Sequence, residues 1–96
     1  MDRSNKYHAD AARGISARAL LENKTLVDAF REIREHYVSA LVSAPLRDVE
    51  GMQKIKMMIG TVDKLKETLE VYVSSGKVAE KELSWLERAK KKLRVV

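Results

Sequence analysis

Two long stretches of the chain repeat apolar residues every three or four positions, which is the spacing of one face of an α-helix. The first stretch runs from Thr25 to Ala44 and the second from Asp48 to about Ser75. Their apolar positions are Leu26, Phe30, Ile33, Tyr37, Ala40, Leu41 and Ala44, then Met52, Ile55, Met58, Ile59, Val62, Leu65, Leu69, Tyr72 and Val73. Strand-type alternation is absent, so the pattern predicts an all-α fold.

Short polar residues and one proline mark where these helices begin and end. Asn23 or Thr25 can cap the first helix, and Asp48 can cap the second. Pro45 ends the first helix because proline disfavours the α conformation of the residue before it. Since the connection is short, we expect the two helices to form an antiparallel hairpin. Gly76 is predicted to end the second helix.

Two weaker helices are expected on either side of the hairpin. A short N-terminal helix covers Ala9 to Glu22, interrupted by Gly14, and residues 1–12 are polar enough for a loose leader. A basic C-terminal helix runs from about Val78 to Leu93. The chain of 96 residues is long enough for one helical domain, residues 1–96. One hairpin and two weak helices cannot cover all the apolar surface, so we expect a homo-oligomer.

Nine hairpin residues and two residues of the last helix are the candidates for the oligomer or partner interface. They are Phe30, Ile33, Tyr37, Leu41, Ile55, Ile59, Val62, Leu69 and Tyr72, followed by Trp85 and Leu86. Trp85 is the single tryptophan, and it could stack on a base, sit at a protein interface or fold back onto the hairpin. Gly60 marks either the close approach of another helix or a tolerated surface position.

The net charge of +5 is concentrated at the C-terminal end, because residues 77–96 alone sum to +4. The basic tail, residues 88–96, holds the candidate nucleic-acid contacts Arg88, Lys90, Lys91, Lys92 and Arg94. Clustered cations bind nucleic acid weakly and without sequence preference by releasing counterions. They also complement a helix dipole and keep proteins soluble, so either role is open.

No catalytic, cofactor or metal site is expected, and the chain is not predicted to be an enzyme. The histidines His8 and His36 lack the second histidine at i+4 that a helical metal site uses. Glycine-rich phosphate loops are absent. The lack of cysteine excludes disulfides and thiolate zinc sites and favours a reducing, intracellular compartment. No apolar run approaches the length of a membrane span or signal peptide, so we expect a cytoplasmic protein without membrane partners.

Four segments carry a resemblance to a known group of proteins. They are residues 19–23 (ALLEN), 29–30 (AF), 45–51 (PLRDVEG) and 69–77 (LEVYVSSGK). From Ala17 to Lys77, about 60 residues, the chain resembles small uncharacterised proteins of tailed bacteriophages and prophages of Gram-negative bacteria. The matching segments mark a cap, a turn and a helix end, and carry no chemistry.

The resemblance implies a phage protein working around head assembly or DNA packaging, in the cytoplasm of the bacterial host or in the virion. The leading hypothesis is therefore a non-enzymatic accessory protein that acts by protein–protein contact, with phage structural or packaging proteins as partners. One alternative is a DNA-binding module, similar in role to a small terminase subunit or a repressor. The neutral body and the absence of a short recognition helix argue against it. The other alternative is an inhibitor of a host enzyme.

Overall fold

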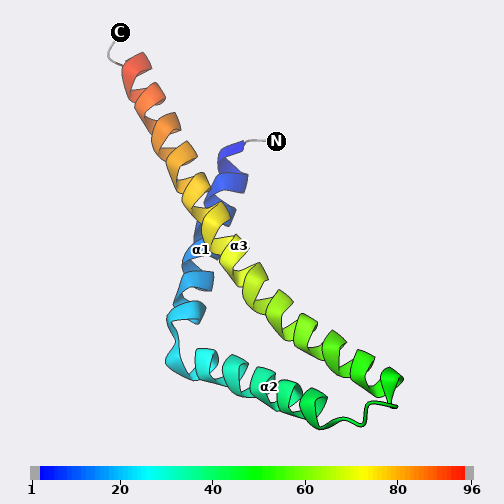
Figure 1. Ribbon diagram of the computed structural model, residues 1–96. Helices are drawn as coiled ribbons and strands as arrows, with labels where there is room; N and C mark the ends of the chain where they lie inside the picture. The colour runs from blue at the N-terminus through cyan, green and yellow to red at the C-terminus, as the bar shows by residue number, and fades with distance from the viewer. Residues whose placement is uncertain (1–2, 95–96) are drawn as a thin grey trace. The chain divides into compact units, whose positions relative to one another are not determined.

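The computed structural model describes residues 3–94, which form three α-helices and no strand (Figure 1). Helix α1 is Arg3–Glu22, α2 is Lys24–Ser43 and α3 is Val49–Arg94. The predicted all-α class is confirmed. The chain divides into two compact units: unit 1 combines the N-terminal segment up to Leu20 with α3 from Leu69 onwards, and unit 2 is Leu21–Thr68.

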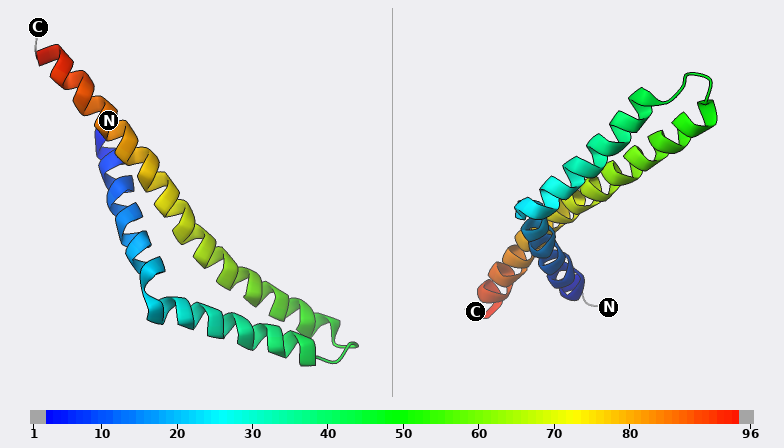
Figure 2. Two further views of the ribbon diagram at one scale, coloured as in Figure 1. Left: turned by 60° about the vertical axis from the view of Figure 1, so that its left-hand side comes forward. Right: turned by 90° about the horizontal axis from the view of Figure 1, so that it is seen from below.

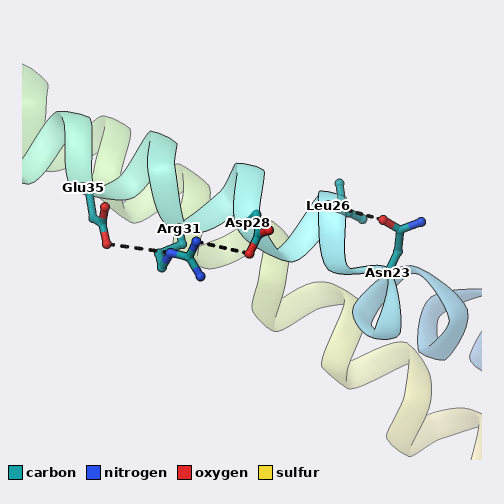
Figure 3. Close-up of polar contacts among 5 residues, drawn as sticks. All are labelled: Asn23, Leu26, Asp28, Arg31 and Glu35. Atoms are coloured by element: carbon teal, nitrogen blue, oxygen red, sulfur yellow. Dashed lines mark hydrogen bonds and ion pairs between the residues drawn. The ribbon is translucent and has the colours of Figure 1, made fainter.

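The ends of α2 and the start of α3 lie where local sequence signals predict them. Of the two candidate caps for α2, Asn23 is the one used, since its side-chain oxygen accepts from the Leu26 backbone N–H at 2.9 Å (Figure 3). Ala44, directly before Pro45, is extended with φ −65° and ψ 139°. Asp48 caps α3, accepting from the backbone N–H of Gly51 at 3.0 Å. These boundaries need no tertiary contact to explain them.

Helix α3 does not end at Gly76, which corrects two expectations. It continues without a break for 46 residues from Val49 to Arg94, so the separate basic helix expected from Val78 is the last part of α3. A glycine that ends a helix takes a left-handed conformation, and no glycine of the described chain has a positive φ. Gly76 is instead a helical residue, and because glycine has no side chain another helix can approach it closely.

Helix α1 is as long as α2, at 20 residues, and is not the short helix expected from the sequence. It begins at Arg3 and so includes residues 3–12, which the sequence placed in a loose leader. Gly14 does not interrupt it. Its less exposed positions Tyr7, Ala11, Gly14 and Ala17 recur every three or four residues, but their side chains are mostly too small to stand out as an apolar face.

The protein has almost no enclosed core. Among residues 3–94, Ala17 and Ala79 are the only buried hydrophobic residues, each 2% exposed, and no large side chain is fully buried. Within each unit a helix is covered along one stripe only, by a single neighbouring helix. The chain accordingly exposes 7945 Å², whereas a compact protein of 10.9 kDa exposes about 5,600 Å².

Candidate interaction surfaces

In unit 2, α2 and the N-terminal part of α3 lie side by side (Figure 2). Six of the predicted interface residues are half-buried in this unit, namely Phe30, Tyr37, Leu41, Ile55, Ile59 and Val62. We call these six side chains the apolar strip. Ile33, at 46%, is more exposed than they are. Both helices of unit 2 therefore carry half-buried apolar or aromatic side chains.

A bidentate ion pair joins α2 to α3 beside this strip. Arg34 donates from Nε to Asp63 Oδ1 at 2.9 Å and from Nη2 to Asp63 Oδ2 at 3.4 Å. The hydrogen bond and the negative charge of Asp63 raise the pKa of Arg34 above its ordinary value. Both side chains are 50% exposed, so the pair contributes little to stability.

The other ion pairs in the described part of unit 2 are local and exposed. Arg31 lies between Asp28, at 3.1 Å, and Glu35, at 3.9 Å, along α2 (Figure 3). Lys54 lies 3.8 Å from Glu50 at the start of α3. Exposed pairs of this kind contribute little to stability. Unit 2 carries eight positive and eight negative side chains, so its net charge is zero.

In unit 1, α1 crosses α3 at a pair of glycines (Figure 1). A Cβ atom added to Gly14 would lie 2.8 Å from Gly76 Cα and 2.9 Å from the carbonyl oxygen of Tyr72. A Cβ atom added to Gly76 would lie 2.8 Å from Gly14 Cα. The two backbones are therefore in direct contact. The buried Ala17 and Ala79 stand three residues after the glycines, so both helices carry the same Gly-x-x-Ala spacing.

Tyr72 belongs to this crossing. The guanidinium carbon of Arg13 in α1 lies 4.2 Å from the centre of the Tyr72 ring, a cation–π contact. Leu69, which is half-buried, also falls in unit 1. These two predicted interface residues therefore lie with the part of α3 that packs against α1, and not in the unit that contains α2.

A shallow depression beside the crossing is too small for a metabolite. Its volume of about 10 Å³ holds roughly one water molecule. The lining residues are Gly14, Ile15, Arg18, Val73, Gly76, Lys77 and Glu80. Across residues 3–94 no three His, Cys, Asp or Glu side chains gather as a metal site would require. Both histidines are exposed, and His36 makes an edge contact with the ring of Tyr37.

The predicted nucleic-acid contacts lie on the last turns of α3. Arg88, Lys90, Lys91 and Lys92 are exposed, while Arg94 closes the helix and its side chain lies outside the described part. Trp85 is 64% exposed, so it does not fold back onto another helix of the chain. Leu86 is half-buried. The cations and the tryptophan are thus exposed on this part of α3, as are Glu82, Glu87 and Leu93.

The contacts that sequence reasoning missed are the Gly14–Gly76 crossing and the Arg34–Asp63 pair. The repeated Gly-x-x-Ala spacing was a usable signal for the crossing, whereas nothing local links Arg34 to a residue 29 positions away.

No helix among the described residues has the length and apolar content needed to cross a bilayer. No protein-family model, curated protein or solved structure matches the chain.

Proposed function

We propose that this protein is a non-enzymatic bacteriophage accessory protein that works by protein–protein contact. It forms a homo-oligomer and assists head assembly or DNA packaging in the cytoplasm of the bacterial host. The observation that carries the proposal is the large apolar surface that the chain leaves uncovered. Surfaces of this kind mark contacts with other proteins.

Large hydrophobic side chains are exposed on all three helices and on the turn before α3. They are Ile15, Leu20, Ile33, Val42, Leu46, Val49, Met57, Met58, Leu65, Val71, Val78, Trp85 and Leu93. The accessible surface exceeds that of a compact protein of this mass by about 2,300 Å². A standard interface buries about 800 Å² on each partner. A second copy of the chain, through one such interface, can therefore cover about a third of the excess.

The oligomerising element in this proposal is an antiparallel hairpin formed by α2 and the first part of α3. Met58 and Leu65, 49% and 53% exposed, are seven residues apart and share one face of α3. Residues seven apart lie within about 20° of each other around a helix, so one helix of a second copy can contact both side chains. These two residues are therefore the strongest candidates for contact with a second copy.

The phage context of the proposal rests on the resemblance between Ala17 and Lys77. The neutral charge of unit 2 disfavours the alternative of a helical body that reads DNA, and no observation favours an enzyme inhibitor. The position of the gene tests the context directly. A place between terminase and portal genes supports the packaging role, whereas a place beside a repressor gene contradicts it.

Self-association is tested by sedimentation equilibrium at micromolar concentration. The parent protein should sediment as a multiple of 10.9 kDa, with a melting temperature that rises with concentration. The double variant Met58→Glu with Leu65→Glu should be monomeric and still helical. Gln53→Glu adds an acidic side chain at another exposed position of α3 and should leave association unchanged. A parent protein that is a 10.9 kDa monomer, with a concentration-independent melting temperature, would overturn the proposal.

A further inference from the structure

One face of α3 in unit 1 carries four cations and the only tryptophan. The basic face consists of Lys77, Lys81, Trp85, Arg88 and Lys92. Successive members are separated by four, four, three and four residues, which at 3.6 residues per turn places all five within about 80° of the helix circumference. All five side chains are exposed. The face is thus continuous over four turns of helix.

No negative charge interrupts the basic face. Glu80, Glu82 and Glu87 occur in the same stretch but fall on other sides of the helix. Within residues 3–94, none of the four cations forms an ion pair. Gly76 and Ala79, which contact α1, lie on the opposite side of α3. Packing against α1 therefore leaves the face open from Lys81 to Lys92, while Lys77 borders the depression at the crossing.

The rest of unit 1 reinforces the positive charge. Because unit 2 has no net charge, the entire +5 of the chain belongs to unit 1. A cluster of uncompensated charge raises the local concentration of an oppositely charged partner. The partner of this face must therefore be an anion, and one extended enough to meet cations along four helical turns.

We propose that the basic face binds a single-stranded nucleic acid. Cations four residues apart are separated by about 6 Å along the helix axis, a distance comparable to that between successive phosphates of one strand. Trp85 stands among them, 64% exposed, and offers an aromatic surface on which an unpaired base can stack. In a duplex the bases are already stacked on one another, so only a single strand uses both the charges and the ring.

An anionic membrane surface fits the same face less well. A helix that lies on a membrane buries a broad apolar face and keeps its cations at the sides. Here the cations occupy the middle of the face, and Trp85 is the one apolar residue among them. Binding to lipid is therefore the competing outcome that the experiment must separate.

Binding by the basic face and binding by the basic tail, as a simple cluster of charge, predict different effects of substitution. Lys90 is exposed but lies on another side of α3, roughly opposite the centre of the basic face. Lys81 is far from the tail but within the face. If the face is the binding site, Lys81 matters and Lys90 does not, whereas a simple tail would show the reverse.

The single tryptophan allows binding to be measured directly on the full chain. Trp85 fluorescence should be quenched by single-stranded oligothymidylate at low salt, and four phosphate contacts give a log–log salt slope of about −2.8. Lys81→Gln and Arg88→Gln should each weaken binding about fivefold at 0.1 M salt. Lys90→Gln is the matched control and should have no effect. Trp85→Leu, measured with a labelled oligonucleotide, should bind the single strand with an affinity lowered by at least about fivefold, while its affinity for a duplex should change little.

Four results would overturn the proposal. They are the absence of quenching at low salt, a Lys90→Gln variant as impaired as Lys81→Gln, equal losses for single strand and duplex in Trp85→Leu, and a Trp85 response to anionic vesicles but not to the oligonucleotide. Circular dichroism should be the same for all variants, because the substituted side chains are exposed. None of these residues belongs to the proposed oligomer contact at Met58 and Leu65, so each proposal can fail without the other.

Discussion

The two units are both pairs of helices, but they are held together in different ways. Unit 2 has no net charge, and its helices are joined by half-buried apolar side chains and by the Arg34–Asp63 pair. In unit 1 the backbones of Gly14 and Gly76 touch, and the unit carries all the net charge. The half-buried side chains of unit 2 serve internal contact, and its exposed Met58 and Leu65 are the proposed contact with a second copy. The basic face, on the far side of α3 in unit 1, remains available for an anionic partner.

The glycine contact has a cost that the apolar strip does not have. Each helical glycine lowers helix stability by about 1 kcal/mol relative to alanine. Close approach offsets this cost by bringing many backbone atoms into van der Waals contact. Unit 1 should therefore tolerate no larger residue at either glycine, whereas unit 2 should respond in a graded way to the trimming of its side chains.

The largest effect is expected from Gly76→Leu. A leucine Cβ would lie 2.8 Å from Gly14 Cα, and because the obstacle is backbone, the helices must separate. Overpacking costs about 1–3 kcal/mol, and since backbone cannot move aside as a side chain can, we expect a cost at the upper end, about 3 kcal/mol. Each kcal/mol lowers the melting temperature by about 4–8 °C in a domain of this size. Gly60→Leu is the matched control, because nothing lies within 4 Å of a Cβ there, and it should be neutral or stabilising. Equal melting temperatures for the two variants would contradict the role of the crossing.

A smaller effect is expected from Phe30→Ala in unit 2. A fully buried phenylalanine costs about 3–5 kcal/mol when truncated, and since Phe30 is half-buried we expect about 2 kcal/mol. Hydrogen exchange should become faster in α2 while the amides around Gly14 keep their protection. If Phe30→Ala accelerates exchange in α1 as much as in α2, relative to the parent protein, the two units are not separate in stability.

The smallest effect is expected from reversing the charges of the exposed ion pair. Arg34→Asp or Asp63→Arg alone places like charges side by side and should lower the melting temperature slightly. The double variant should restore it, and the difference should shrink as salt screens the charges. If the double variant loses as much stability as the losses of the two single variants added together, the two side chains do not interact in solution.

Local signals in the sequence were sufficient for the helix boundaries around Asn23, Pro45 and Asp48, because each acts on its own neighbours. They failed at Gly76, where the usual reading of a glycine as a helix end was overridden by a contact with Gly14. The extent of α1 was missed for a related reason. Its inner face is made largely of glycine and alanine, which carry little hydrophobic signal although they permit the closest packing.

Gly60 is a second glycine whose role the sequence could not decide. The sequence left open whether this glycine marks a close approach or a tolerated surface position, and the structure places nothing within 4 Å of it. Two helical glycines of α3, Gly60 and Gly76, thus have different roles. The difference lies entirely in what packs against them.

Unit 1 is discontinuous in the sequence, and this bears on the order of folding. Arg34 and Asp63 close a loop of 29 residues, whereas Gly14 and Gly76 close one of 62. Loop-closure entropy makes the longer loop more costly by about 0.6 kcal/mol if it must close from the unfolded chain. Formation of unit 2 first removes most of that loop from the search. We therefore expect α1 to dock last during folding and to detach first when the protein opens.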